Sequence, residues 1–153
     1  MKDLAIAHYQ VSSAAAESAA AACARQARSL HTPVSIAVVD TGGHLMAFLR
    51  TDGAPFHTRG IAEDKAVTAV SFGVPTRTLA EALQAQPELV RSGLQLRPQF
   101  VMLAGGLPIR FEGKVIGAIG VSGATEEIDE RIAAAGLDAF LTHSSQQPTT
   151  DRT

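Results

Sequence analysis

The spacing of apolar residues changes several times along the chain and divides it into helical and extended segments. Residues 14–29 are rich in Ala, which has the highest helix propensity, and they predict a helix. Residues 34–40 are apolar and β-branched, which is typical of a strand covered on both faces. Gly42-Gly43 can adopt the positive φ angles of a tight turn, so residues 44–50 are expected to return as an antiparallel strand.

The middle third of the chain has helical spacing. Apolar residues recur at that spacing over residues 58–72, and Gly73 and Pro75 interrupt the pattern. A short helix is expected over residues 76–83, and Pro87 is expected to start one further helical turn.

The last third predicts a meander of strands and a final helix. Turns containing glycine separate three apolar runs that we expect to form strands, at residues 100–103, 107–111 and 114–121. Thr125 can cap a helix that continues to about Leu141. Residues 144–153 are polar and are expected to form a flexible C-terminal tail.

This order of elements predicts an α+β fold. Strands joined by short turns are antiparallel, and helices separate the two groups of strands, so we expect a mainly antiparallel sheet of about five strands. The chain has 153 residues, of which 46% are hydrophobic and only 5% aromatic. A chain of this length builds one core, here from Ala, Val, Ile and Leu, so residues 1–143 are expected to form a single domain.

The charge and the cysteine content of the chain exclude several classes of function. The 13 basic and 15 acidic residues are scattered along the chain and predict no nucleic-acid partner. The lone Cys23 has no second cysteine for an internal disulfide, and neither a secretory signal nor an apolar stretch of membrane-spanning length is found. A soluble, cytoplasmic protein with no membrane partner is therefore expected.

Six short blocks resemble, in their order along the chain, the signature of a known family. They are Val38–Leu45, Arg50–Pro55, Lys65–Ala69, Pro75-Thr76, Gly105–Pro108 and Gly117–Gly123. Over roughly residues 11–141 the chain is thereby similar to the GlcG/HbpS family. The resemblance implies a profilin-like sheet flanked by helices, a homo-oligomer, and binding of haem, with haem degradation in some relatives. Relatives also form the C-terminal part of corrinoid adenosyltransferases, an activity that we do not expect here.

Haem iron takes a His, Met, Cys or Tyr ligand, and the chain offers several. The histidines are His8, His31, His44, His57 and His143. His57, between Pro55 and the second predicted helix, is the ligand that we favour, and His44, after the Gly-Gly turn, is the second candidate. An exposed side chain without a ligand is the alternative interpretation for each of them.

Arg50, Asp52 and Lys65 predict a site for an anion. Arg50 can bind a carboxylate through two parallel hydrogen bonds, and Asp52 can orient that side chain or stabilise the turn. Lys65 shares a helical face with apolar residues, so its amine emerges from partly apolar surroundings. Lys65 could therefore bind a haem propionate or another carboxylate, act as a base, or pair with a nearby acidic residue.

Two further segments are expected to contact the same ligand. Gly105 and Gly106 can let a ligand approach main-chain N–H groups, and Ser122 can supply a hydroxyl. These expectations depend on one spatial prediction, namely that the bend at Arg50, the amine of Lys65 and the corner at Gly105 surround a shared hollow.

The sequence favours a haem-binding or haem-handling protein. One alternative is an enzyme, a lyase or isomerase acting on a small carboxylated metabolite, with Arg50 holding the carboxylate and Lys65 moving a proton. Another alternative is a non-catalytic oligomeric accessory module.

Overall fold

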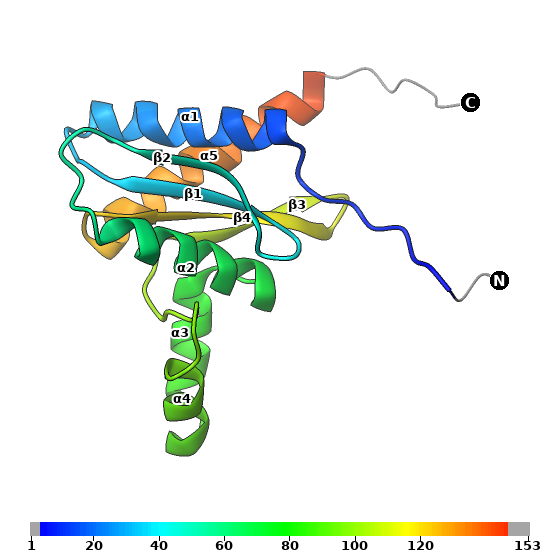
Figure 1. Ribbon diagram of the computed structural model, residues 1–153, viewed down its shortest axis with the longest axis vertical. Helices are drawn as coiled ribbons and strands as arrows, with labels where there is room; N and C mark the ends of the chain where they lie inside the picture. The colour runs from blue at the N-terminus through cyan, green and yellow to red at the C-terminus, as the bar shows by residue number, and fades with distance from the viewer. Residues whose placement is uncertain (1–3, 147–153) are drawn as a thin grey trace.

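The computed structural model describes residues 4–146, which form one sheet with helices on both of its faces (Figure 1). The helices are α1 (Ser13–Ser29), α2 (Thr58–Phe72), α3 (Thr76–Gln84), α4 (Glu88–Gln95) and α5 (Glu126–Gln146). The strands are β1 (Ser35–Asp40), β2 (Leu45–Arg50), β3 (Gly106–Phe111) and β4 (Lys114–Ser122). The sheet has the order β2-β1-β4-β3, and every neighbouring pair is antiparallel.

The domain has three layers, and this explains why β1 is apolar along its whole length. Helices α1 and α5 cover one face of the sheet and α2 covers the other (Figure 1). Successive strand residues point to opposite faces, so Ile36 and Val38 pack under α1 and α5 while Ala37 and Val39 pack under α2. The prediction of a strand covered on both faces is confirmed.

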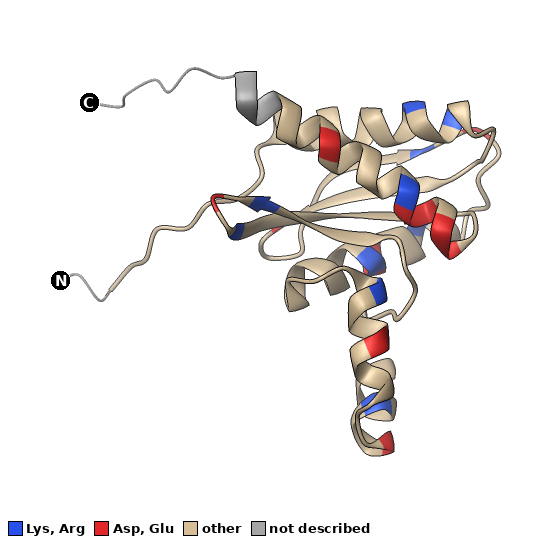
Figure 2. Cartoon of the chain, turned by 180° about the vertical axis from the view of Figure 1, so that it is seen from behind, with Lys and Arg blue, Asp and Glu red and all other residues tan. Residues whose placement is uncertain are grey.

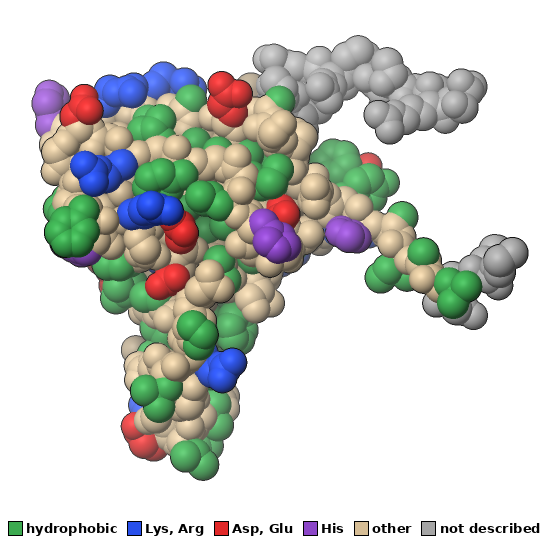
Figure 3. All heavy atoms as spheres, viewed as in Figure 1, with side chains coloured by type: hydrophobic (Ala, Val, Ile, Leu, Met, Phe, Trp, Pro, Cys, Tyr) green, Lys and Arg blue, Asp and Glu red, His purple; other side chains and the backbone are tan. Residues whose placement is uncertain are grey.

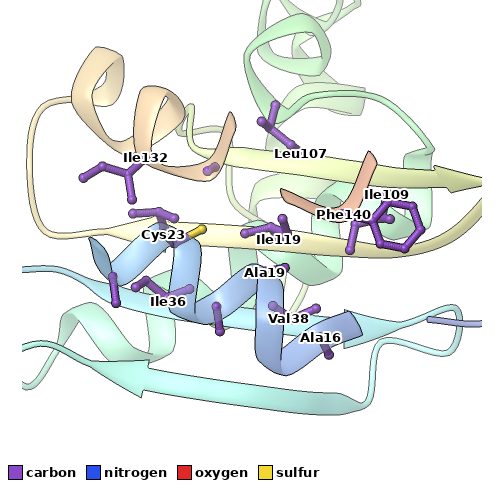
Figure 4. Packing of buried hydrophobic residues seen from close by; sticks show 14 of the residues in the cluster. Ala16, Ala19, Cys23, Ile36, Val38, Leu107, Ile109, Ile119, Ile132 and Phe140 are labelled. Carbon is purple, nitrogen blue, oxygen red and sulfur yellow. The ribbon is translucent and has the colours of Figure 1, made fainter. Parts of the chain in front are cut away.

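The larger core lies between the sheet and the helices α1 and α5. The hydroxyl of Ser12 accepts a hydrogen bond from the N–H of Ala15 and caps α1, whose small side chains then face the sheet and α5. Figure 4 shows Cys23 among these buried residues, and a Cβ on Gly136 of α5 would collide with its sulfur. Burial raises the pKa of the Cys23 thiol to about 12, so this cysteine is an inert core residue.

The smaller core, beneath α2, is built from alanines and glycine. Ala62, Ala66 and Ala69 pack against Ala37, Val39 and Ala118. Gly120 of β4 lies directly under the backbone of α2, where a Cβ would overlap the carbonyl oxygen of Ala62. The α2 backbone therefore contacts the sheet with almost no side chains between them.

The sheet has four strands, and the strand predicted at residues 100–103 is the one that does not form. Its backbone bonds to side chains in place of a neighbouring strand. The N–H of Val101 donates to the Thr68 hydroxyl at 3.1 Å, and the N–H of Ala104 donates to the Glu126 carboxylate at 2.9 Å. Because these partners satisfy the segment locally, it crosses α2 as an irregular chain. The α+β class and the antiparallel sheet are confirmed.

Two helices extend further than predicted. After Pro87, α4 continues for two turns to Gln95, and together with α3 it projects from the domain as an arm, residues 76–97 (Figure 1). Helix α5 continues past Leu141 to Gln146, so residues 144–146 are helical where a tail was expected. The remainder of the predicted tail, residues 147–153, lies outside the described residues.

No helix within residues 4–146 combines the length and apolar character needed to cross a bilayer.

The contact of α2 with β4 predicts opposite effects for two glycine substitutions. Gly120→Ala should lower the free energy of unfolding by about 3 kcal/mol, because the new methyl group has to push the α2 backbone away from the sheet. Gly60→Ala, in α2 itself, meets no atom within 4 Å and should raise it by up to about 1 kcal/mol through helix propensity. Urea denaturation of both variants measures the difference, and equal effects would contradict the close contact.

Candidate functional site

Lys65 is the most buried of the residues predicted to bind a ligand. Its side chain is 2% exposed and leaves α2 toward the end of β4. The Nζ atom donates to the Asp129 carboxylate at 2.8 Å and to the carbonyl oxygen of Val121 at 2.9 Å. Lys65 thus joins α2, β4 and α5 at one point inside the protein.

Asp129 is held on both of its oxygens. Burial raises the pKa of this carboxyl, while the Lys65 ammonium and the N–H of Ala124, 3.0 Å from the other oxygen, oppose the rise. Both charges are paired and hydrogen-bonded, which is the condition for keeping an ion pair in a protein interior. Asp129 occupies the position beside the Lys65 amine that an anionic ligand was expected to take.

The Gly105-Gly106 corner packs against the same ion pair. Gly105 has φ +118°, and a Cβ there would lie 2.7 Å from the carbonyl oxygen of Val121 and 3.0 Å from Lys65 Nζ. The N–H of Gly106 donates to the Thr76 hydroxyl at 3.0 Å, so it is already bonded within the chain. Glycine is required here by close packing and by the left-handed backbone.

Arg50 and Asp52 lie elsewhere, in a surface hollow of about 360 Å³. The hollow is lined by Ala27, Arg28, His31, Thr32, Pro33, Leu49, Arg50, Thr51 and Asp52. It is formed where α1 ends and β2 ends, at the same end of the domain (Figure 1). Its size is at the lower limit of sites that enclose small molecules.

Two backbone features build the walls of this hollow. His31 has φ +52°, a left-handed conformation that ends α1, and its N–H donates to the carbonyl of Arg28 at 3.0 Å. On the opposite wall, the Thr51 hydroxyl accepts from the N–H of Val34 at 2.8 Å and ties the turn after β2 to the start of β1. The two walls are therefore held by the domain itself.

The charges in the hollow suit a carboxylate. Two guanidinium groups, Arg28 and Arg50, face one carboxylate, Asp52, so the lining is positive before His31 is counted. Guanidinium groups bind carboxylates through paired hydrogen bonds. Arg28 also lies in the last turn of α1, where a cation offsets the partial negative charge of the helix end.

The prediction of one shared hollow around Arg50, Lys65 and Gly105 is wrong. Arg50 is at the end of β2, beside the helix layer of α1, whereas Lys65 comes from α2 on the other face of the sheet. The Lys65 amine and Gly105 are buried together and do not line the hollow. Ser122, predicted to donate to the same ligand, is buried at the end of β4.

The two histidines predicted as iron ligands are both exposed and lie apart from this hollow. His57 precedes α2 and its ring contacts Phe56 edge-on, with the ring centres 6.1 Å apart. His44 lies in the β1–β2 turn, with Nδ1 3.2 Å from the Asp40 carboxylate. Asp40 also accepts the N–H groups of Gly42 and His44, so the pair stabilises the turn. Their ligand roles stay predictions.

Comparison with known proteins identifies the family. A family model described as haem degrading protein HbpS-like matches residues 11–138. The chain belongs to this family. It is 40% identical over 129 residues to an uncharacterised 15.0 kDa protein of Citrobacter freundii encoded between dhaT and dhaS, a match covering 83% of this chain and 89% of the relative.

Two solved structures have the same fold. The protein ORFY of Klebsiella pneumoniae is 32% identical, with a TM-score of 0.84, and the match covers 95% of this chain and 98% of ORFY. A complex of PduOC with haem is 28% identical, with a TM-score of 0.78, and the match covers 85% of this chain and 94% of PduOC.

In this HbpS-like chain, several of the sequence blocks that resemble the family signature contain buried residues that pack the interior. Lys65, Gly105, Gly106 and Gly120 make the contacts between α2, β3 and β4 described above. A block that is needed for packing gives no information about chemistry. Other parts of these blocks are accessible to solvent, among them the segment from Arg50 to Asp52, at the hollow, and the exposed His44.

Sequence reasoning missed Asp129 and Arg28, and it included His31 only among the five histidines without favouring it. Of these three residues, Asp129 had a signal in the sequence. Asp129 lies on the apolar face of α5 with Ile132 and Ala133, and a carboxylate in an apolar stripe indicates a buried partner. Arg28 and His31 had no such signal, because they border the hollow only after α1 packs beside the end of β2.

The buried ion pair predicts a large loss of stability when it is broken. Lys65→Met should lower the free energy of unfolding by about 3 to 5 kcal/mol, because Asp129 is left charged and unpaired in the interior. Arg59→Met removes an exposed ion pair with Glu63 on the same helix and should cost less than about 1 kcal/mol. Chemical denaturation compares the two, and similar losses would argue against a structural role for the buried pair.

Proposed function

We propose that this chain binds haem through the hollow between the end of α1 and the end of β2. Membership of the HbpS-like family and the similarity to a protein solved with haem support this assignment. The single observation in this chain that carries it is the set of side chains lining the hollow, where an imidazole and two guanidinium groups border one opening.

The donor set of the hollow fits the chemical groups of haem. Haem needs a side-chain donor for iron, cations for its propionates and apolar contact for its ring. His31 supplies the donor, Arg28 and Arg50 supply the cations, and Leu49 and Pro33 supply apolar surface. Bound haem contributes redox-active iron, while the residues of the chain bind and orient the group. Among the side chains that the structure describes, in residues 4–142, no cluster of three or more His, Cys, Asp or Glu could bind a metal ion by itself.

For the enzyme alternative, Arg50 can still bind a carboxylate, but Lys65 is not accessible as a general base. Arg50 in an open hollow suits a small carboxylate as well as a haem propionate. Lys65, however, is bonded to Asp129 and is 2% exposed, so a substrate in the hollow has no access to its amine. We therefore favour haem binding over a lyase or isomerase that uses Lys65.

A cytoplasmic location of the protein remains a prediction.

Hemin titration tests the assignment. Wild-type protein should give a saturable Soret shift at roughly one equivalent, and His31→Ala or the double variant Arg28→Ala/Arg50→Ala should weaken hemin binding about tenfold or more, a loss of about 1.4 kcal/mol. Arg59→Ala, which removes an exposed guanidinium of α2 that does not line the hollow, is the matched control and should bind as the wild type does.

The same titration decides between the three candidate ligands. His57→Ala and His44→Ala are measured beside His31→Ala, and the variant that alters both the Soret position and the affinity identifies the iron ligand. A wild-type chain without any saturable shift rules out haem binding at this site.

We propose that the arm of residues 76–97 mediates the homo-oligomer implied by the family. Helix α4 has eight residues, none of them buried, and such a short helix is marginal in water without a packing partner. Leu89 and Leu96 are both 85% exposed, and Figure 3 shows apolar side chains along the arm. Charges of both signs lie on it as well (Figure 2), with Glu88 at the start of α4 and Arg97 just beyond its end.

This charge order makes the arm complementary to a second copy of itself. Within its own helix the Glu88 carboxylate accepts from the Arg91 guanidinium and the Ser92 hydroxyl. If two α4 helices pack antiparallel, Glu88 of each copy also meets Arg97 of the other, beside the exposed Leu89 and Leu96. Leu89→Asp should therefore reduce the solution mass of the protein, measured by light scattering, without changing its circular dichroism. Arg59→Met, on α2, serves as a surface control, and an unchanged mass for Leu89→Asp contradicts this interface.

A further inference from the structure

The segment before α1, residues 4–10, is extended and leaves the body of the domain (Figure 1). Its root is fixed, because the N–H of Val11 donates to the carbonyl of Ile116 at 2.7 Å and the Tyr9 ring contacts Phe111 edge-on at 5.9 Å. Beyond this root the apolar side chains have no cover, since Leu4 is 85% and Ile6 is 88% exposed. The segment therefore exposes apolar side chains of the kind that a strand buries when it joins a sheet.

Its backbone is also unpaired. No hydrogen bond joins the main chain of residues 4–10 to any other residue that the structure describes. Leu4 and Ile6 alternate with Ala5 and Ala7, so in an extended chain the two larger side chains lie on one face. An extended segment with free N–H and C=O groups and an apolar face can add to the edge of a sheet as a further strand.

The sheet offers two edges, and they differ in their ability to accept a strand. The outer strand β3 contains Pro108, which has no N–H and limits pairing. The opposite outer strand, β2, has no proline or glycine, and its sequence Leu-Met-Ala-Phe-Leu is uncharged up to Arg50. Charges and prolines are the usual protection of an edge, so β2 is the open edge of this sheet.

The segment does not pair with the β2 edge of its own chain. It leaves the body beside Phe111, at the end of β3, whereas β2 lies on the other side of the sheet, three strand spacings away in the order β2-β1-β4-β3. Residues 4–10 extend away from the domain, so the β2 edge of their own chain stays open (Figure 1).

We propose that residues 4–10 of one copy of this chain pair, as an added strand, with the β2 edge of a second copy. Residues 4–8, beyond the fixed contact of Tyr9, are long enough to pair with most of the six residues of β2, and Leu4 and Ile6 then contact the partner. Reciprocal exchange of the two segments closes the pair and leaves neither β2 edge open. This assembly uses a surface separate from α4, and the β2 strand that it covers ends in Leu49 and Arg50, which also line the hollow.

Amide hydrogen exchange and solution mass test the pairing. In the double variant Ala5→Pro/His8→Pro the segment stays extended and keeps Leu4 and Ile6, but it loses one N–H group on each side of the strand, so one of the two losses falls on the paired side in either register. We expect the amides of residues 45–50 to exchange about tenfold faster than in the wild type, with a lower mass by light scattering at equal concentration. Leu4→Asp/Ile6→Asp should have the same effect.

Matched controls separate this interface from the others. Phe56→Asp introduces the same charge at a side chain that is 82% exposed and remote from the segment, and it should leave exchange at β2 unchanged. Equal β2 exchange in the wild type and the proline variant overturns the proposal. Loss of protection with aspartate but not with proline also overturns it, because apolar docking without strand pairing would then explain the contact.

Discussion

The structure depends on the contact between the backbone of α2 and the sheet. Ala62 and Lys65 place their carbonyl groups against Gly120 and Gly106, where any larger residue would force the helix away. At this distance a long side chain of α2 has no space beneath the helix. Lys65 therefore extends along the sheet to the end of β4, where its charge requires a buried partner and finds Asp129.

This arrangement separates the residues that hold the fold from those that are free for chemistry. The Lys65 amine, the Asp129 carboxylate and the N–H of Gly106 are bonded within the chain, and the neighbouring glycines are required by steric contact. On the opposite helix layer, α1 ends beside the end of β2, and the side chains there are free to contact solvent. We propose haem binding at this second place because, among the described residues, no side-chain hydrogen bond or ion pair engages the Arg50 guanidinium or the His31 imidazole.

Sequence reasoning was accurate where local chemistry decides the structure. The helix beginning after Ser12 and the hairpin across Gly42-Gly43 formed as expected, because capping, propensity and turn residues act over a few positions. It was wrong for residues 100–103, which have the composition of a strand. There the Thr68 hydroxyl and the Glu126 carboxylate take the hydrogen bonds that a neighbouring strand would have made, and both come from distant parts of the chain.

The sequence by itself determined the α+β class, the order of the elements and the presence of charged residues in apolar helical stripes, because each follows from the spacing of side chains along one segment. Only the tertiary structure decided that Lys65 pairs with Asp129, 64 residues away, and that Arg28 and His31 share a hollow with Arg50. The physical reason is that a buried charge requires a partner without specifying which one. The partner is chosen by how closely the helices pack on the sheet.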